Sequence, residues 1–252
     1  MKVMITAGGT SEPIDGVRKI TNMSTGRLGA LIAATILNEI PKAEIFFLGT
    51  DSAINILNSF FHSLEDDCPN LTIVKITDTK SLEEEMYRLL KRTRINSVIH
   101  SMAVSDYRVE KVVDIEKIIS DAENMTKEEI ISMLKNPPSL DTSTKMSSSA
   151  EKVDIRLTKN PKLIDMVKEV SPDSQLIGFK LLNHVSEEEL IKVARESLLR
   201  TRADYIVAND LAFIKAGNHK AFVVDKDTAE SVEGKIAIAK EITNLVKESD
   251  YE

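Results

Sequence analysis

The sequence has one cysteine, no long hydrophobic run and no surplus of basic residues. A single cysteine, Cys68, excludes a scaffold held together by internal disulfides. No apolar run approaches the roughly 18 to 20 residues of a membrane-spanning helix. The net charge of −7 argues against non-specific binding of nucleic acid, which depends on an excess of Lys and Arg. We therefore expect neither a membrane nor a nucleic acid as partner.

Signals for a metal site and for export are also lacking. The four histidines have no metal-ligand spacing and no cysteine partner, so no metal ligand is predicted; they are His62, His100, His184 and His219. The chain runs directly into the apolar stretch Val3 to Ala7, without the charged and long apolar segments of a signal peptide. These features predict a cytoplasmic protein.

Short apolar runs alternate with segments of helical period along most of the chain. The runs of strand length are Val3 to Ala7, Ala43 to Leu48, Leu71 to Ile76, Ser97 to Ser101, Leu176 to Phe179, Tyr205 to Ala208 and Ala221 to Asp225. The helical segments are Leu28 to Ile40, Leu82 to Arg92, Pro161 to Val170, Ser186 to Arg200 and Lys235 to Lys247. This alternation predicts a doubly wound, Rossmann-like α/β fold with a mostly parallel sheet. At 252 residues, one domain over residues 1–252 is the default.

Two stretches interrupt the alternation. The connection from Gly8 to Gly26 is too long for an ordinary βα turn, so it is either functional or disordered. Residues 107–153 contain a polar helical piece, Thr126 to Lys135, and then Asn136 to Pro138 and a Ser/Thr-rich run. We interpret this second stretch as an insertion after the fourth strand, with a mobile part.

Glycines and hydroxyls at the two ends of the first long connection indicate a phosphate site. Gly8 and Gly9 follow the first strand, whereas Ser24, Gly26 and Gly29 open the first long helix. Glycines let a phosphate approach backbone N–H groups, and a helix N-terminus adds partial positive charge. The spacing is not that of the dinucleotide fingerprint G-x-G-x-x-G. A tight turn followed by a helix start is the alternative.

Six segments, in the right order, resemble the phosphopantothenate–cysteine ligases (phosphopantothenoylcysteine synthetases) of the DNA/pantothenate metabolism flavoprotein-like superfamily. They are Ile20 to Gly29, Ser101 to Tyr107, Lys145 to Ser148, Leu157 to Pro161, Ile177 to Lys180 and Ala208 to Asp210. Two departures stand out: Met102 replaces a usual Ala, and Lys180-Leu181-Leu182 replaces Ala-x-Glu-Thr after the Gly-Phe pair. The chain begins at the ligase's first strand, so the resemblance implies the standalone bacterial type, without the flavin-dependent decarboxylase half.

The resemblance implies an enzyme of coenzyme A biosynthesis that joins 4′-phosphopantothenate and L-cysteine. The reaction proceeds through an acyl-nucleotide, uses CTP, with ATP as the alternative, and releases CMP and pyrophosphate. Mg²⁺ neutralises the triphosphate. The resemblance also implies a homodimer.

Asn22 and Lys145 are the catalytic residues that the resemblance implies. An amide N–H stabilises charge on a carbonyl without titrating, and a lysine on a closing loop engages the nucleotide. We expect the Ser/Thr-rich loop from Ser143 to Ala150 to be disordered without ligand. The predicted substrate-binding residues are Asn22, Met102, Ala103 and Asp106. The predicted nucleotide-binding residues are Gly8, Gly9, Ser24, Gly26, Gly29, Asp106, Lys145, Lys159, Asn160, Phe179 and Asn209.

Other interpretations stay open. From sequence alone, Asn22 is a turn amide, Asp106 a helix N-cap and Lys145 a solvated charge. A nicotinamide-dependent oxidoreductase of the same fold is disfavoured, because no acidic residue precedes Asp51 at the end of the second strand. A non-catalytic nucleotide-binding protein is the third hypothesis.

Overall fold

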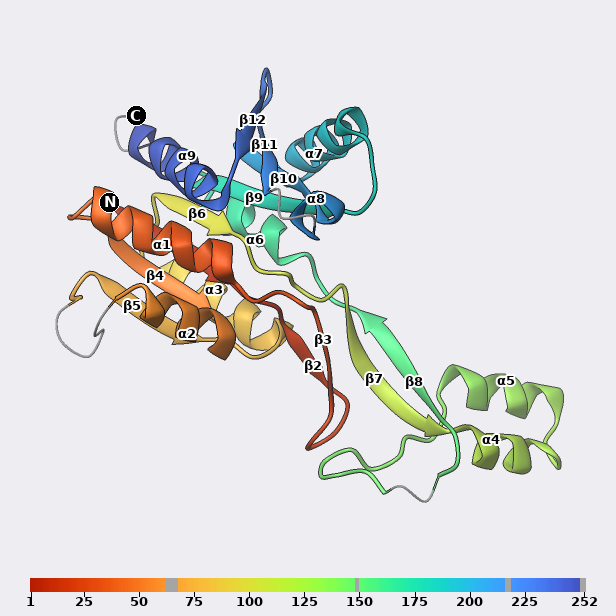
Figure 1. The fold of residues 1–252 in the computed structure, drawn as a ribbon. Helices are drawn as coiled ribbons and strands as arrows, with labels where there is room; N and C mark the ends of the chain where they lie inside the picture. The colour runs from red at the N-terminus through yellow and green to blue at the C-terminus, as the bar shows by residue number, and fades with distance from the viewer. Residues whose placement is uncertain (62–67, 148–149, 216–218, 250–252) are drawn as a thin grey trace. The chain divides into compact units, whose positions relative to one another are not determined.

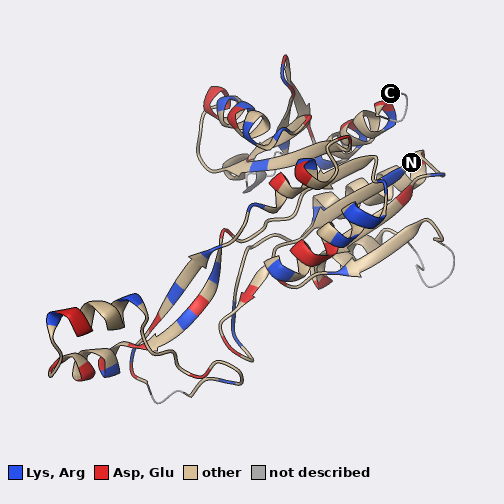
Figure 2. Ribbon diagram, turned by 180° about the vertical axis from the view of Figure 1, so that it is seen from behind, with Lys and Arg blue, Asp and Glu red and all other residues tan. Residues whose placement is uncertain are grey.

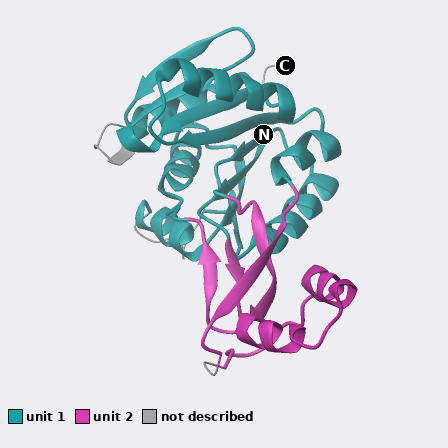
Figure 3. Ribbon diagram, turned by 90° about the vertical axis from the view of Figure 1, so that its right-hand side faces the viewer, with its two compact units in different colours: residues 1–10, 23–103, 162–252 teal, residues 11–22, 104–161 magenta. Residues whose placement is uncertain are grey.

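The computed structural model describes residues 1–61, 68–147, 150–215 and 219–249. These residues form two compact units (Figure 3). Unit 1 consists of Met1–Thr10, Met23–Ala103 and Lys162–Glu252, and unit 2 of Ser11–Asn22 and Val104–Pro161. No described helix is long and apolar enough to cross a membrane.

The described residues of unit 1 form an eight-stranded sheet in the order β12-β11-β10-β9-β6-β1-β4-β5 (Figure 1). The strands are β1 (Lys2–Ala7), β4 (Glu44–Gly49), β5 (Leu71–Lys75), β6 (Ser97–His100), β9 (Gln175–Leu182), β10 (Tyr205–Asp210), β11 (Lys220–Val224) and β12 (Ala229–Glu233). Neighbours from β10 to β5 pair in parallel, whereas β11 and β12 pair antiparallel at one edge. The mostly parallel, doubly wound α/β fold is therefore confirmed.

Helices cover both faces of this sheet. They are α1 (Arg27–Glu39), α2 (Asp51–Ser59), α3 (Thr79–Arg92), α6 (Leu163–Val170), α7 (Glu187–Thr201), α8 (Leu211–Lys215) and α9 (Lys235–Glu248). Helix α1 packs against α2 and α9, while α6 packs against α3 and α7. The core between the sheet and helices α1, α2 and α9 includes Ile5, Phe47, Ile36 and Ile242, each at most 1% exposed.

Capping side chains set where the helices begin. Ser186 is the expected N-cap of α7, and its hydroxyl accepts a hydrogen bond from Glu189 N at 3.2 Å. Helix α3 begins at Thr79, three residues before the predicted start, because the capping box of Asp78 and Ser81 starts it there. The predicted helical segment starts two residues too early at Pro161, because Lys162 is the N-cap and α6 begins at Leu163.

The chain order places a topological switch point between β1 and β6. From β1 the chain continues outward to β4 and β5, and then crosses back to β6, β9 and β10 on the other side of β1. Ligands of open α/β sheets bind beyond the carboxyl ends of the strands at such a point. The segments from Gly8 to Thr10 and from Ser101 to Ala103 follow these two strands.

Unit 2 contains two antiparallel hairpins and two helices. They are β2 (Ser11–Pro13) with β3 (Lys19–Thr21), β7 (Tyr107–Asp114) with β8 (Val153–Lys159), α4 (Ile115–Ala122) and α5 (Lys127–Lys135). Basic and acidic residues alternate over α4, α5 and the second hairpin (Figure 2). The predicted insertion, residues 107–153, thus lies in a unit that also takes residues 11–22 from the first long connection.

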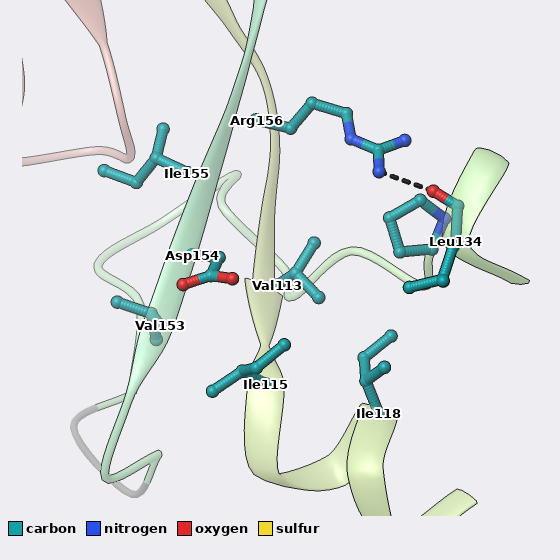
Figure 4. A pocket seen from close by; sticks show the side chains of 9 residues that line it. Val113, Ile115, Ile118, Leu134, Val153, Asp154, Ile155 and Arg156 are labelled. Carbon is teal, nitrogen blue, oxygen red and sulfur yellow. Dashed lines mark hydrogen bonds between the residues drawn. The ribbon is translucent and has the colours of Figure 1, made fainter. Parts of the chain in front are cut away.

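A groove of about 390 Å³, lined by apolar side chains together with Asp154 and Arg156, lies between the second hairpin and the helices of unit 2 (Figure 4). Its lining includes Val113, Ile118 and Ile155. The Arg156 guanidinium donates to the carbonyl oxygens of Leu134, at 2.6 Å, and Lys135, at 2.7 Å. These carbonyls end α5, so Arg156 satisfies the helix C-terminus and fixes α5 to β8.

Candidate active site

The segments after β1 and β6 pair with each other. Ala103 N donates to Gly8 O at 2.9 Å, and Thr10 N donates to Ala103 O at 3.1 Å. Met102 is 6% exposed, and its N–H donates to Thr6 Oγ1 at 3.3 Å. The backbone N–H groups of both predicted substrate residues, Met102 and Ala103, are therefore already used within unit 1, and a substrate would have to meet other atoms of these residues.

Three of the predicted phosphate-site glycines are required by packing. A Cβ on Gly8 would lie 2.1 Å from Thr50 Oγ1, and one on Gly26 would lie 2.4 Å from the Cβ of Ala53. A Cβ on Gly29 would lie 2.6 Å from Ser101 Oγ. Packing within the chain therefore excludes any side chain at these three positions. Approach of phosphate is therefore not needed to explain these glycines.

The N-terminus of α1 still has the properties of an anion site. Its N-cap is Gly26, which has φ 75° and no side chain to accept from the first turn. The first N–H groups of a helix lack intrahelical partners, and the helix dipole favours a negative group beside them. Ser24, two residues earlier, is half-buried. Backbone donors and one hydroxyl therefore gather at this helix start.

His100, to which the sequence analysis gave no role, supports the segment after β6. Its ring is buried, and burial lowers the pKa of His100 to about 4, so the ring is neutral near pH 7. Thr6 Oγ1 lies 3.0 Å from His100 Nδ1 and accepts from Met102 N. We assign the Thr6 hydroxyl as donor to Nδ1, with the ring hydrogen on Nε2. A buried histidine thus orients the threonine that holds Met102.

At β9 and β10, the predicted Phe179 and Asn209 have structural contacts. Phe179 pairs with Val207 and packs partly buried against the core. Asn209 is 9% exposed, and its Nδ2 donates to Lys220 O at 3.2 Å. This bond ties β10 to β11, so the Asn209 amide has a partner within the sheet.

The neighbouring Asp210 holds the loop after β9. Its carboxylate accepts from Val185 N at 2.9 Å, Ala212 N at 2.7 Å and His184 N at 3.3 Å. These bonds, above all the one from Val185, hold the pKa of Asp210 below its usual range. Asp210 therefore fixes the position of the strand ends that carry Phe179 and Asn209.

In unit 2 the structure brings Asp106 and Asn160 together. Asn160 N donates to Asp106 O at 2.9 Å, and Asn160 Nδ2 donates to Ser105 O at 3.0 Å. Asn160 Oδ1 accepts from Arg108 Nη1 at 3.0 Å. Asn160 is 5% exposed, whereas Asp106 and the adjacent Lys159 are exposed. The buried amide joins two loops, and the charged side chains of Asp106 and Lys159 lie at the surface next to them.

The two predicted catalytic residues also lie in unit 2. Asn22 directly follows β3 and is half-buried, and its carbonyl oxygen accepts from Thr21 Oγ1 at 3.4 Å. Lys145 is exposed. Its two neighbours, Thr144 and Met146, are hydrogen-bonded to residues of the β2–β3 turn. Residues 148 and 149 of the predicted loop lie outside the described residues.

Asp15, whose carboxylate accepts from Met146 N, and its partner Arg18 are not among the residues predicted from the sequence. A signal was present: the run Asp15-Gly16-Val17-Arg18 lies in a connection too long for a simple turn. An aspartate favours such turns because its side chain bonds backbone N–H groups two or three residues on.

No group of three or more His, Cys, Asp or Glu side chains suited to a metal ion exists among the described residues. Mg²⁺ in nucleotide-dependent enzymes is held by one or two carboxylates together with substrate phosphates and waters.

The family model of the DNA/pantothenate metabolism flavoprotein C-terminal domain matches residues 1–142 and 136–249. The coenzyme A biosynthesis bifunctional protein CoaBC of Thermococcus kodakarensis is 29% identical over 231 residues, which are 92% of this chain and 46% of that protein. The chain thus spans about half the length of the curated relatives it matches.

Solved structures agree with this match. The DNA/pantothenate metabolism flavoprotein from Streptococcus pneumoniae is 38% identical, with a TM-score of 0.78 and full coverage of both chains. A Cab2 mutant in complex with phosphopantothenate-cysteine has a TM-score of 0.70 over 99% of this chain and 87% of its own, and its 17% identity shows the shared fold alone. The chain belongs to the family of the DNA/pantothenate metabolism flavoprotein C-terminal domain.

Proposed function

We propose that this chain is a phosphopantothenate–cysteine ligase that uses CTP. The observation on which the proposal rests is the family match over nearly the whole chain, residues 1–142 and 136–249. The relatives named for coenzyme A biosynthesis support the choice of pathway. The switch point between β1 and β6 supports a ligand site at that edge of the sheet.

The proposed reaction has two steps. A carboxylate oxygen of 4′-phosphopantothenate attacks the α-phosphorus of CTP, and the bond to the β-phosphate oxygen breaks, which releases pyrophosphate. The amine of L-cysteine then attacks the acyl carbon. CMP leaves with the electron pair of the acyl–oxygen bond, and the nitrogen loses one proton as the amide forms. Positioning and charge stabilisation provide most of the rate enhancement in such reactions.

Each proposed residue has one task. The Asn22 amide donates to the carbonyl oxygen on which charge develops, and Lys145 approaches the phosphates. The N-terminus of α1, with Gly26 as its N-cap, receives a negative group of a substrate. Asp106 and Lys159 provide exposed charges for substrate and nucleotide. Mg²⁺, when bound with the triphosphate, neutralises its charge.

An assay of pyrophosphate release tests the function. The purified chain should release pyrophosphate from CTP with phosphopantothenate and Mg²⁺, and mass spectrometry should detect the acyl-cytidylate when cysteine is omitted. Cysteine should then convert the intermediate to amide and CMP. Unphosphorylated pantothenate is the matched control substrate. Absence of both pyrophosphate and amide in the complete mixture would contradict the proposal.

The same assay separates the two alternatives. A nicotinamide-dependent oxidoreductase would change the absorbance of NADH, and a non-catalytic nucleotide-binding protein would bind CTP without turnover. Asp51, the acidic residue after β4, opens α2 and pairs with Lys75 at 2.8 Å. A ribose-binding acid would have to give up that ion pair, so the structure adds no support to the oxidoreductase. A homodimer is also proposed, and its test is the mass of the protein in solution.

A further inference from the structure

The turn between β2 and β3 is built around one buried carboxylate. The side chain of Asp15 is 0% exposed and accepts from Val17 N at 2.9 Å and Arg18 N at 2.8 Å. Arg18 adds a bidentate pair, Nε at 2.9 Å and Nη2 at 2.5 Å. Met146 N is the fifth donor, at 3.0 Å. All acceptor sites of a carboxylate are occupied by this set. We call residues 15–18 the Asp15 turn.

The Asp15 turn holds the chain on both sides of Lys145. On the N-terminal side, Gly16 N donates to Thr144 O at 3.1 Å. On the C-terminal side, Met146 gives its N–H to the Asp15 carboxylate and receives the Arg18 guanidinium on its carbonyl oxygen at 3.2 Å. The Met146 side chain is only 6% exposed. Two hydrogen-bonded neighbours therefore flank the lysine.

Lys145 itself is left exposed. No ion pair links it to another residue in the part of the chain that the structure describes. The Asp15 turn packs closely against the backbone of Thr144 and Lys145, and this packing depends on a glycine. A Cβ on Gly16 would lie 3.1 Å from the carbonyl carbon of Thr144 and 3.4 Å from Lys145 N. The backbone at Lys145 is thus fixed while its ammonium group remains available.

We propose that the Asp15 turn positions Lys145 for the nucleotide, with Asp15 as a positioning residue that acts through the lysine and not on the substrate. The inference rests on the proposed function, because it takes Lys145 as catalytic. Holding the lysine's backbone in advance removes the ordering cost that would otherwise accompany each turnover. A bidentate, buried aspartate suits this task because its geometry is fixed by five hydrogen bonds.

Asp15→Asn tests the proposal, because it keeps the size of the side chain but turns an NH₂ group toward donors that need an acceptor. We expect kcat to fall about 10-fold to 100-fold, as misplacement of a catalytic group by about 1 Å does. We also expect faster hydrogen exchange at the Met146 amide. Asp225→Asn is the matched control, because Asp225 also accepts turn N–H groups, from Asp227 and Thr228, but contacts neither neighbour of Lys145.

The double variant separates positioning from a general structural effect. If Asp15 acts through the lysine, Asp15→Asn combined with Lys145→Gln should be no slower than Lys145→Gln alone. Losses that multiply, or an Asp15→Asn variant with wild-type kcat beside an inactive Lys145→Gln, would overturn this proposal alone. A fully active Lys145→Gln would overturn the proposed role of the lysine as well. Should Asp15→Asn fail to fold, Gly16→Ala serves with the same readouts.

Discussion

Asn22 is the single side chain on which the proposed acyl transfer depends most. It follows β3 and is half-buried outside the hydrophobic core, so its removal should leave the fold intact. We expect Asn22→Ala to lower kcat by about 100-fold to 1000-fold, the usual cost of losing one well-placed donor to a developing charge. Steady-state pyrophosphate release measures the loss, and circular dichroism checks the fold.

Asn22→Asp is the matched variant, because it keeps the shape of the side chain but replaces the N–H donors with an anion. It should be at least as slow as Asn22→Ala, since a carboxylate repels the charge that the amide is proposed to stabilise. An Asn22→Ala enzyme with near wild-type turnover would remove Asn22 from the reaction.

His100 makes the stability of unit 1 depend on pH. Burial lowers its pKa in the folded chain to about 4, below the 6.5 of an exposed histidine. The unfolded chain therefore binds more protons between these values. Stability is present above pH 6.5 and is lost as the pH falls toward 4. We expect the free energy of unfolding to fall by about 2 kcal/mol between pH 7 and 5 from this group alone.

Urea denaturation of the wild type and of His100→Gln at both pH values checks this prediction. A constant cost of the substitution cancels, because only the difference between the two pH values is compared. The variant should lose about 2 kcal/mol less than the wild type over this range. Equal losses in the two proteins would show that the pKa of His100 does not change on folding.

At the scale of the elements, the start of α1 depends on close packing against α2. Gly26 has φ 75°, and a Cβ there would lie 2.4 Å from the Cβ of Ala53 and 2.8 Å from Gly8 N. We expect Gly26→Ala to lower the free energy of unfolding by at least about 2 kcal/mol, from left-handed backbone and overpacking together. Urea denaturation measures the change.

A double-mutant cycle with Ala53→Gly separates the two contributions. Removing the Cβ of Ala53 relieves one of the contacts, so the double variant should be less destabilised than the sum of the single variants. The cost of the left-handed backbone at residue 26 and the cost of the contact with Gly8 should remain in the double variant. Strict additivity would mean that the Ala53 contact does not contribute, and that the backbone conformation alone requires glycine.

Helices and strands are predictable from the sequence where the local pattern agrees with the packing. They are missed where contacts between residues distant in the sequence determine the structure. The core strands β1, β4 and β6 were found because apolar runs record burial on both faces. The hairpin of β7 and β8 was missed, since seven pairs join segments almost forty residues apart, and β8 is largely exposed. Strand β12 was missed for the same reason, being an exposed edge strand.

Site residues follow the same distinction. The sequence predicts Gly8 and Gly26 as positions that a phosphate approaches, and the fold adds a reason that no motif contains: Thr50 and Ala53 leave no room for a Cβ there. The contact of Asp15 with Met146 spans 131 positions, and no local pattern indicates it. A sequence motif therefore locates Lys145, while only the fold reveals what holds it.

At the scale of the whole molecule, the chain spans about half the length of curated relatives described as bifunctional. Its 252 residues nevertheless contain a complete eight-stranded sheet, counted over the described residues, and unit 2. The S. pneumoniae structure covers the same length in full. Amide formation by this chain alone is consequently the natural test of whether the proposed ligase reaction needs anything further.

The preference for one nucleotide is a property measured on the whole chain. We expect CTP to give a kcat/KM at least about 10-fold above that of ATP, equivalent to about 1.4 kcal/mol. A site that hydrogen-bonds the edge of one base leaves its own polar groups unpaired when another base enters, and that penalty is the source of discrimination.

UTP is the matched control, because it keeps the size of the pyrimidine and exchanges the 4-amino donor for a carbonyl acceptor. If recognition is by the base edge, UTP should fall with ATP; if it is by size alone, UTP should match CTP. Competition of the three nucleotides in the pyrophosphate assay decides between these outcomes, and an equal or higher kcat/KM with ATP would overturn the choice of CTP.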